Sequence, residues 1–300
     1  MEYVWLYDGE QQIPCPALPN ANSAARKWFF LIPTIVCPVQ LLIDAPFGKF
    51  APSNESIFVV DGIKSWIVME LVSPVTFIAA LYSAPLSTSP SALSIPQIIL
   101  AGLFLFHYLN RAILSPLRTP SRSKSHIIVS LSGVTFNLPN GALMGTYLTS
   151  PSATAFLAGA LSRPSFWAGI LLWAAGFAGN ILHDEVLLNI RRNATAKGKR
   201  NENQAGKEHY AIPRGYLYRY ISYPNYFCEW LEWFGYALAA APFPAFMSLS
   251  ATMQTIQPPW LFIWAEVLLM ISRAYKGHQW YHKKFPEYPK ERKAVVPFIL

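Results

Sequence analysis

The sequence predicts an all-α, polytopic integral membrane protein with about seven transmembrane helices. Three observations support this fold class. Of the 300 residues, 53% are hydrophobic and only 13% are charged, roughly half the charged fraction of a soluble domain. Apolar runs of roughly 20 residues, the length that spans a bilayer, recur along the whole chain. The basic residues gather in the connections on one side of these runs.

Seven runs are long and apolar enough to be membrane helices, although Pro and Gly interrupt several of them, as membrane helices tolerate. The fourth is the weakest, because Asn137, Pro139 and Asn140 break it. No internal repeat is visible, so we expect one membrane domain, 1–300, whose N-terminal part, 1–60, contains the first helix. The expected helices are 28–46, 65–84, 95–114, 126–149, 165–189, 227–249 and 258–276.

The placement of charge predicts the orientation of these helices. If the helices alternate in direction, one side receives the loops 47–64, 115–125 and 190–226 and the C-terminal tail. Only Arg26, Lys27 and Arg163 of the 24 Lys and Arg residues fall on the other side. Since basic loops face the cytosol, we expect a luminal N-terminus and a cytosolic C-terminus.

Several classes of protein and site are disfavoured. The three Cys residues are too few and too scattered for a disulfide framework or a zinc site, so we expect no metal. The first 25 residues do not read as a cleavable signal, so the first helix is expected to direct insertion. The net charge of +8 lies in short loops and the C-terminal tail. It therefore indicates lipid headgroups or a phosphorylated cofactor rather than nucleic acid.

The basic segment 191–215 is expected to be a solvated cytosolic loop without full order. The sequons at Asn54 and Asn193 fall on the cytosolic side, so we expect neither to be glycosylated.

Ionisable and polar residues inside the expected helices are the first candidates for function, because they are costly in a membrane. Helix-to-helix hydrogen bonding is the alternative for each, and we prefer it for Glu232 and Glu266. It fits Glu70 less well, since Glu70 is several residues from the nearest charge and needs a buried donor. The full set is Glu70, His107, Tyr108, Arg111, Asn180, His183, Asp184, Asn225, Glu229, Glu232, Glu266 and Arg273.

Polar and basic residues are dense at the cytosolic ends of the later helices, in 179–192, 209–233 and 273–298. These three segments lie at one membrane depth and can line one cavity open to the cytosol. Arg suits phosphate, and Asn and Asp suit ribose or amide groups. The chain has no Gly-x-Gly-x-x-Gly after a strand, which excludes a Rossmann domain, so any dinucleotide must be bound by the membrane helices and their loops.

From about residue 60 to 300 the chain resembles the 3-oxo-5α-steroid 4-dehydrogenases, the steroid 5α-reductase family. The order and spacing of many short motifs carry the resemblance. They are Trp66 to Glu70-Leu71, His107-Tyr108-x-x-Arg111, Asn140-Gly141 with Gly145-x-Tyr147, Asn180 with Asp184 and Arg191, Tyr210-x-Ile212-Pro213-x-Gly215, Tyr223-x-Asn225-Tyr226-x-x-Glu229-x-x-Glu232-Trp233-x-Gly235, Arg273-Ala274, His278-x-Trp280-Tyr281, Lys284-Phe285-x-x-Tyr288-Pro289-x-x-Arg292-Lys293 and Pro297-Phe298.

The resemblance implies a seven-helix reductase of the endoplasmic reticulum membrane that binds NADPH in a cytosol-facing pocket formed by residues 165–300. Glu70 and Tyr108 would face the substrate carbonyl, and Arg118 is the alternative to Arg122 at a phosphate. Trp66 would pack near the nicotinamide, and Glu229 would organise the pocket. The cofactor residues implied are Trp66, Arg122, Asn180, Asp184, Arg191, Tyr210, Asn225, Glu229, Arg273, His278 and Tyr281.

The chemistry implied is reduction of a C=C bond conjugated to a ketone, the Δ4 bond of a 3-oxo-steroid or a similar lipid. Tyr108 would donate a hydrogen bond to the carbonyl oxygen, and Glu70 would orient Tyr108 or donate directly. Three departures from the family weaken steroid-specific recognition: Ala211 stands where Arg is usual, Gly277 stands where His is usual, and the loop 193–208 is long.

Alternatives stay open on the sequence alone. The same chemistry could act on an enoyl thioester, a polyprenal, or a terpenoid or polyketide enone. An isoprenylcysteine-type methyltransferase, which uses S-adenosylmethionine, also ends in an Arg/His/Tyr-rich segment. A transporter or lipid sensor would use its buried polar residues only for packing. The expected partners are a lipid-like enone and membrane lipids, with no nucleic acid, and the protein is expected to be a monomer.

Overall fold

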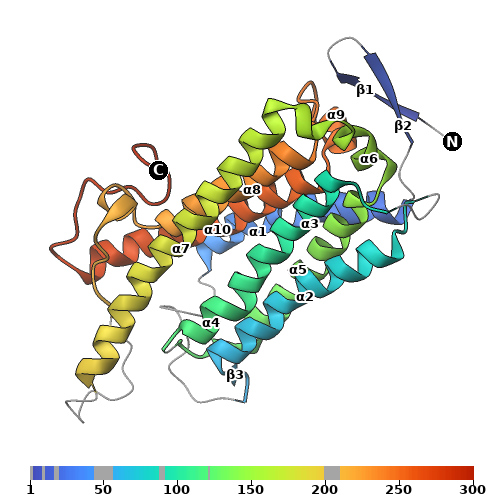
Figure 1. Ribbon diagram of the computed structural model, residues 1–300. Coiled ribbons are helices and arrows are strands. Elements are labelled where there is room, and N and C mark those ends of the chain that lie inside the picture. The colour runs from blue at the N-terminus through green and yellow to red at the C-terminus, as the bar shows by residue number, and fades with distance from the viewer. Residues whose placement is uncertain are drawn as a thin grey trace.

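The computed structural model describes residues 3–8, 11–16, 20–43, 57–87, 92–120, 122–198 and 210–300. Asn54 and the part of the expected loop at 199–209 lie outside them. Long helices packed side by side form the body of the molecule, and the short strand pair β1 and β2 lies at one end (Figure 1). The strands are β1 Tyr3–Asp8, β2 Gln11–Pro16, β3 Val59–Val60 and β4 Ser125–His126, and β1 pairs with β2 and β3 with β4, both antiparallel.

A helix lies at each of the seven expected membrane segments. The helices are α1 Asn20–Leu42, α2 Gly62–Ser83, α3 Ile95–Tyr108, α4 Ser115–Arg118, α5 Ile127–Leu148, α6 Pro151–Leu157, α7 Pro164–Gly198, α8 Pro224–Ala240, α9 Leu249–Thr255 and α10 Pro258–Lys284. Between α3 and α4 the chain stays helical but is π-helical over Leu109–Leu114. Two short 3₁₀ turns, Ala160–Ser162 and Tyr216–Arg219, complete the elements.

The helices start where the sequence supplies caps. The side chain of Asp61 accepts from the backbone N–H groups of Ile63 and Lys64 at the start of α2. Ser94 and Gln97 form a capping box at the start of α3. Three later helices, α7, α8 and α10, begin at a proline, where the missing N–H costs nothing.

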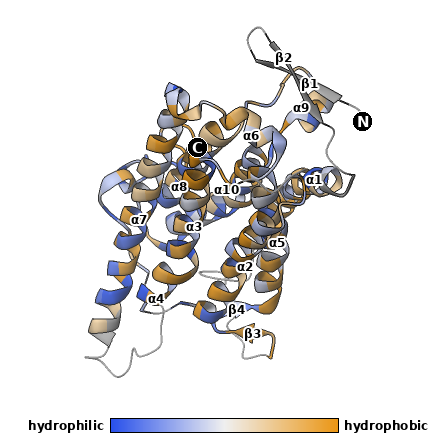
Figure 2. Ribbon diagram, turned by 45° about the vertical axis from the view of Figure 1, so that its right-hand side comes forward, coloured by the Kyte–Doolittle hydropathy of each residue, from blue (hydrophilic) through white to orange (hydrophobic). Residues whose placement is uncertain are grey.

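Within the described residues, five helices are long and apolar enough to cross a membrane, namely α1, α2, α3 through α4, α5 and α7. The bent pair α9 and α10, at 119° to each other, makes six if it is counted as one span. Large apolar side chains such as Val68, Val75 and Leu171 are exposed on these helices, and hydrophobic residues lie along their outer faces (Figure 2). The chain is therefore a multi-pass membrane protein, and the count of seven spans stays a prediction.

Four expected boundaries are wrong. The first helix was expected to begin at 28, but α1 begins at Asn20, and the seventh was expected to end at 276, but α10 continues to Lys284. The sixth helix was expected to run to 249, but α8 ends at Ala240, because Pro242 and Pro244 follow and cannot continue a helix. The fifth was expected to end at 189, but α7 continues to Gly198, so the start of the expected loop at 191–215 is helical.

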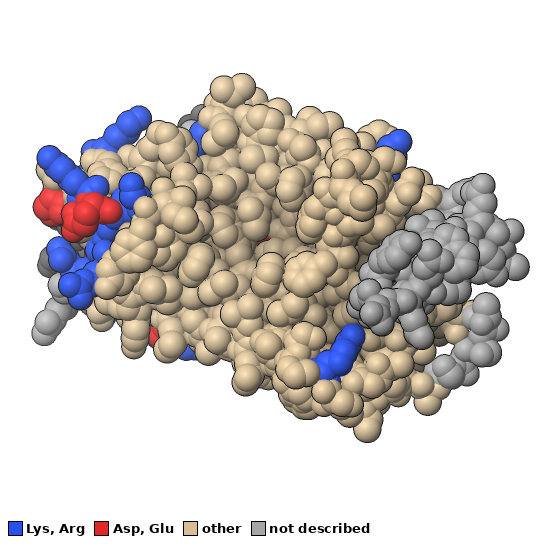
Figure 3. Space-filling model, turned by 90° about the horizontal axis from the view of Figure 1, so that it is seen from above, with Lys and Arg blue, Asp and Glu red and all other residues tan. Residues whose placement is uncertain are grey.

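Charged side chains gather at one end of the molecule, the end at which α7 and α10 finish (Figure 3). The strand β3, directly before α2, and the helix α4 lie at the lower side of the same half (Figure 1). This is the separation of charge that the alternating helices predict.

The helices that carry the site pack closely. An added Cβ on Gly141 of α5 would lie 2.0 Å from the carbonyl oxygen of Ser73 on α2, so only glycine allows these two helices to approach this far. The aromatic core lies beside this contact, where Phe77 stacks on Phe104 at 4.1 Å between ring centroids and Phe104 contacts Trp233. This packing holds α2, α3, α5 and α8 around one polar centre.

Candidate active site

A cavity of about 780 Å³ lies between α1, α2, α5, α8, α10 and the π-helical segment. Much of its wall is apolar, with side chains such as Phe29, Phe136 and Phe262. Polar groups from α2, α3, the π-helical segment, α8 and α10 meet on it, among them Glu70, His107, Tyr108, Arg111, Glu229 and Glu266. A cavity that combines an apolar wall with a few convergent polar groups is typical of a small-molecule site.

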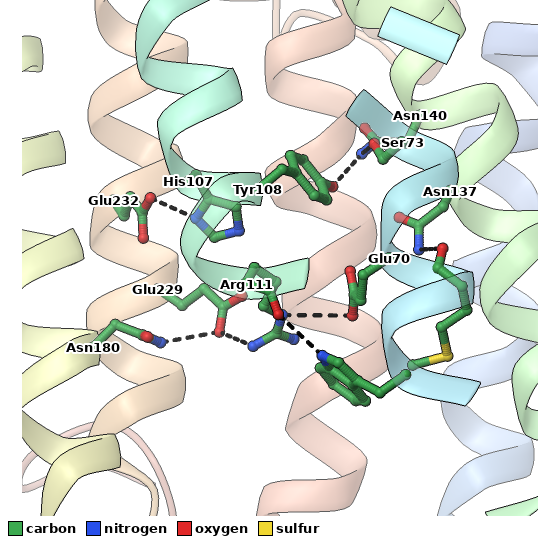
Figure 4. A network of polar contacts seen from close by, with 12 residues as sticks. Glu70, Ser73, His107, Tyr108, Arg111, Asn137, Asn140, Asn180, Glu229 and Glu232 are labelled. Carbon is green, nitrogen blue, oxygen red and sulfur yellow. Dashed lines mark hydrogen bonds and ion pairs between the residues drawn. The ribbon is translucent and has the colours of Figure 1, made fainter. Parts of the chain in front are cut away.

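Arg111 is the centre of the polar groups (Figure 4). Its Nε lies 3.5 Å from Glu70 Oε1 and its Nη1 lies 3.2 Å from Glu229 Oε2. Its carbonyl oxygen accepts from Trp66 Nε1 at 3.2 Å. A guanidinium in this setting is stable because two carboxylates compensate it. Arg111 stands in the π-helical segment, and such segments are frequent at functional sites.

Tyr108 is held by a separate hydrogen bond. Its side chain is buried, and its hydroxyl oxygen accepts from Asn140 Nδ2 at 2.8 Å. The same amide nitrogen donates to Ser73 Oγ at 2.9 Å. Glu70 is expected to orient Tyr108, but Glu70 pairs with Arg111, and the hydrogen bond that holds the Tyr108 hydroxyl comes from Asn140. Because Asn140 supplies the proton of this bond, the bond does not use the hydroxyl proton of Tyr108, and the hydroxyl can still act as a donor to a ligand.

A second buried pair lies beside Tyr108. His107 Nδ1 is 2.7 Å from Glu232 Oε1, and this contact joins α3 to α8. The Glu232 side chain is 0% exposed. Its expected role as a helix-packing residue is confirmed in the sense that it connects two helices.

Four of the expected cofactor residues form one hydrogen-bonded chain between α7 and α8. Asn180 Nδ2 donates to Glu229 Oε2 at 3.1 Å and to the carbonyl oxygen of Asn225 at 3.0 Å. Asn225 Nδ2 donates to Asp184 Oδ1 at 3.0 Å. The chain connects the centre at Arg111 to the C-terminal half of α7, as a binding site for an elongated ligand requires.

Arg122 and Arg118 have different surroundings. The Arg122 guanidinium lies 3.7 Å from the centroid of the Trp66 ring and is partly buried. Burial lowers the pKa of Arg122 to about 9, and the neighbouring guanidinium groups of Arg111 and Arg191 act in the same direction. Arg118 is instead largely exposed and pairs with Glu185 at 2.5 Å. The geometry therefore favours Arg122 over Arg118 as a site residue.

The remaining expected residues divide between the cavity and a neighbouring cluster. Arg273 lines the cavity. His278 Nδ1 and Ser222 Oγ are 2.6 Å apart, and Ser222 Oγ is 2.7 Å from Tyr288 Oη. Tyr281 stacks on Tyr288, and Tyr210 contacts Trp280 edge to face. Three expected residues, Tyr210, His278 and Tyr281, thus support the C-terminal segment around α10.

Comparison of the sequence with known proteins shows which family the chain belongs to. The family model described as 3-oxo-5-alpha-steroid 4-dehydrogenase matches residues 123–300, which include α5 to α10. The chain belongs to this family. It is therefore an enzyme of an oxidoreductase family, which leaves the methyltransferase and non-catalytic alternatives without support.

Relatives of the steroid 4-dehydrogenase family match nearly the whole chain. An uncharacterized protein of Schizosaccharomyces pombe is 40% identical over 282 residues, 88% of this chain and 94% of the relative. The 3-oxo-5-alpha-steroid 4-dehydrogenase 1 of Bos taurus is 34% identical over 268 residues, 89% of this chain and 92% of the relative. Steroid 5-alpha-reductase DET2 of Solanum lycopersicum is 29% identical over 281 residues, 90% of this chain and 95% of the relative.

One departure from the family pattern has a structural reason in this steroid 4-dehydrogenase homologue. A Cβ on Gly277 would lie 1.6 Å from Tyr223 Oη. The absence of a side chain at 277 therefore makes room for the Tyr223 ring, which also contacts Tyr226 at 5.0 Å. Any larger residue at this position would require Tyr223 to move.

The sequence predicts no specific role for three residues that hold the site together. Arg111 was recognised as a charge inside the membrane, and its position four residues after His107 places both on one face of a helix. Asn140 was seen as a break in the fourth helix, although its side chain bonds to Tyr108. Ser73 carried no signal, since a serine in an apolar helix is unremarkable in sequence.

Proposed function

We propose that this protein reduces the C=C bond of an α,β-unsaturated ketone in a lipid-like substrate, with NADPH as hydride donor. The observation that carries the proposal is the hydroxyl group of Tyr108, which accepts from Asn140 at 2.8 Å on a cavity whose other walls are largely apolar. The Δ4 bond of a 3-oxo-steroid is the substrate bond we favour. The family description and the names of the Bos taurus and Solanum lycopersicum relatives support this choice.

The chain's own residues fit a phosphorylated dinucleotide. Among the described residues, no carboxylate lies within ion-pair distance of Arg122, whose guanidinium is stacked on Trp66. A partly buried cation of this kind is suited to an anionic ligand. Arg122, Arg191 and Arg273 would hold phosphate groups, and the chain of Asn180, Asn225 and Asp184 would bind ribose or amide groups. NADPH, when bound, supplies a hydride from C4 of the nicotinamide.

Tyr108 would stabilise the charge that develops during the reaction. When hydride reaches the β-carbon, negative charge moves to the carbonyl oxygen. A fixed donor at that oxygen typically contributes a factor of roughly 100 to 1,000 in turnover. Tyr108 would donate this hydrogen bond, and Asn140 keeps its hydroxyl in place. The Arg111 guanidinium, 3.5 Å from Glu70, adds positive charge near the same end of the cavity.

The cellular setting is part of the proposal. We infer seven spans in the endoplasmic reticulum membrane, with the C-terminus in the cytosol and the protein acting as a monomer. The basic residues at one end of the molecule support this orientation (Figure 3). A cytosolic opening gives the site access to NADPH, while the substrate is supplied by the membrane.

Incubation of membranes that contain this protein with NADPH and a Δ4-3-ketosteroid tests the proposal. Mass spectrometry should find a product heavier by two hydrogens. The Tyr108→Phe variant should lose roughly 99% of turnover or more and keep the NADPH affinity of the wild type. Equal loss of turnover and NADPH affinity would remove the assigned role of Tyr108. If the protein bound NADPH but reduced no steroid, the substrate would belong to another class of enone. If the folded protein did not bind NADPH, the assignment of NADPH as the cofactor would be wrong.

A further inference from the structure

We propose that His107, backed by Glu232, is the acid that protonates the α-carbon of the substrate. This inference rests on the proposed enone reduction and completes it. Hydride addition leaves an enolate, and the carbon next to the carbonyl must then receive a proton. Tyr108 is committed to the carbonyl oxygen, and Arg111 is committed to two carboxylates. Another proton donor on the cavity wall is therefore required.

His107 is placed for this role. It directly precedes Tyr108 on α3 and lines the same cavity. Its ring is fixed by edge-to-face contacts with Tyr108 at 5.1 Å and Trp233 at 4.6 Å between centroids. Nδ1 faces Glu232, and the opposite side of the ring faces the region in which Tyr108, Arg111 and Glu70 gather (Figure 4). Among the described residues, His107 Nε2 has no hydrogen-bond partner.

Charge balance predicts where the proton of this pair lies. Glu232 is fully buried, and its Oε2 has no partner among the residues that the structure describes. An ionised carboxylate in this place next to a neutral imidazole would leave one uncompensated buried charge, which is costly. Two arrangements avoid this cost without placing a proton on Oε2, where it would have no acceptor among the described residues. Either a protonated Glu232 donates to Nδ1 of a neutral imidazole, or an imidazolium donates to the Glu232 carboxylate. In both arrangements Nε2 carries a proton, and Nε2 is on the cavity side.

The proton transfer balances in either arrangement. The enolate takes the proton from Nε2, a C–H bond forms at the α-carbon, and the N–H bond breaks. The imidazole ends neutral with its proton on Nδ1, and Glu232 ends as a carboxylate. In both arrangements the pair of His107 and Glu232 goes from neutral to a single negative charge, so the enolate charge has passed to the pair, which then recovers a proton from solvent through the cavity. Glu232 thus allows His107 to act as an acid without forming an imidazolate.

Glu266 is the competing donor. It also lines the cavity, it is buried, and its Oε2 lacks a hydrogen-bond partner within the described chain. We prefer His107 because its Nδ1 lies 2.7 Å from Oε1 of Glu232, which can resupply the proton. The experiment below includes Glu266 so that the two assignments give different results.

The protonation state can be measured without any turnover. Nitrogen NMR of the wild-type protein labelled with ¹⁵N-histidine, with His107→Gln to assign the signal, should show a proton on Nε2 of His107 near neutral pH. An unprotonated Nε2, with the proton of the pair on Nδ1 alone, would overturn the inference whatever the substrate.

Isotope effects test the role in catalysis. His107→Gln and Glu232→Gln should each lower turnover, the first by roughly 100-fold or more. In both variants the isotope effect from NADPH deuterated at C4 should shrink and the solvent D₂O effect should grow, because proton transfer becomes the slow step. Phe177→Leu, which changes a ring packed against His107 without changing charge, should alter neither isotope effect.

Three outcomes of the isotope experiment differ in meaning. Slower variants with unchanged isotope effects would show that His107 only supports the fold, which would overturn the inference. The same change of isotope effects in Glu266→Gln, and not in His107→Gln, would assign the proton to Glu266 and overturn it as well. No enone reduction by the wild type would refute the proposed function itself and with it the need for this donor.

Discussion

At the scale of single residues, Arg111 and Arg122 differ in what surrounds their positive charge. Arg111 has Glu70 and Glu229 beside it, whereas Arg122 has an aromatic ring. The pKa of Arg122 is lowered from 12.5 to about 9, because burial and two neighbouring guanidinium groups disfavour its charge. At neutral pH the side chain is still charged, so its charge lowers the free energy of unfolding of the ligand-free protein. This destabilisation decreases as the pH rises above about 9, where the folded protein loses the proton and the unfolded chain keeps it. Binding of an anion also removes it.

Arg122→Gln should therefore have opposite effects on stability and binding. It should raise the melting temperature of the ligand-free protein by roughly 2 °C or more. It should weaken NADPH binding by roughly tenfold or more, because a charged hydrogen-bond donor is lost. In the wild type, NADPH affinity should fall above pH 9, and the variant should lack this fall. Thermal unfolding and NADPH titration at pH 7 and pH 10 measure both effects.

Arg118→Gln is the matched control, since Arg118 is exposed and pairs with Glu185. It should leave NADPH affinity unchanged. Loss of affinity in the Arg118 variant and none in the Arg122 variant would contradict the placement of the phosphate beside Trp66.

The candidate site residues were predictable from sequence to the extent that a buried charge is conspicuous. Glu70, Tyr108 and Glu229 were named before the structure, and all three line the cavity. The partners were not predictable, because a hydrogen bond such as Asn140 to Tyr108 joins residues 32 positions apart in the chain. The pairing of His107 with Glu232 spans 125 positions. Such contacts depend on how helices pack, and a single sequence does not specify that.

At the scale of helices, the close contact between α2 and α5 determines the position of Asn140, the hydrogen-bond partner of Tyr108. Gly141 →Ala would place a Cβ 2.0 Å from the Ser73 carbonyl oxygen, so α5 would have to move away from α2. The hydrogen bonds of Asn140 to Ser73 and Tyr108 would lengthen. We expect a lower melting temperature and a loss of turnover that exceeds the loss of NADPH affinity, as measured by thermal unfolding and steady-state kinetics.

Gly102→Ala on α3 is the control, because its added Cβ meets nothing within 4 Å. It should leave turnover unchanged, since alanine also favours helix. If Gly141→Ala behaved like Gly102→Ala, the close approach of α2 and α5 would not be required for the site.

The existence of the helices followed from hydropathy, but their ends and irregularities did not. The apolar run 95–114 predicted a helix, while the π-helical turn at Leu109–Leu114 that carries Arg111 has no signature in composition. The end of α8 at Ala240 follows from Pro242 and Pro244, which the count of apolar residues passed over. Hydropathy thus predicts that a segment is helical better than it predicts where the helix stops.

The separation of charge predicts the topology at the scale of the whole molecule. In intact microsomes a tag at the C-terminus should be accessible to added protease, and a tag at the N-terminus should be protected. The sequons at Asn54 and Asn193 should stay unmodified, because both would face the cytosol. Glycosylation of either sequon, or protection of the C-terminal tag, would contradict the orientation and the odd number of spans.

Transfer of deuterium from NADPH deuterated at C4 to a Δ4-3-ketosteroid tests the central claim most directly. We predict a product with one deuterium at the β-carbon when the reaction runs in ordinary water, and one at the α-carbon when unlabelled NADPH is used in D₂O. Both labels should vanish together with turnover in Tyr108→Phe. A reduced product without deuterium from the cofactor, or no product from any enone while NADPH is bound, would contradict the account.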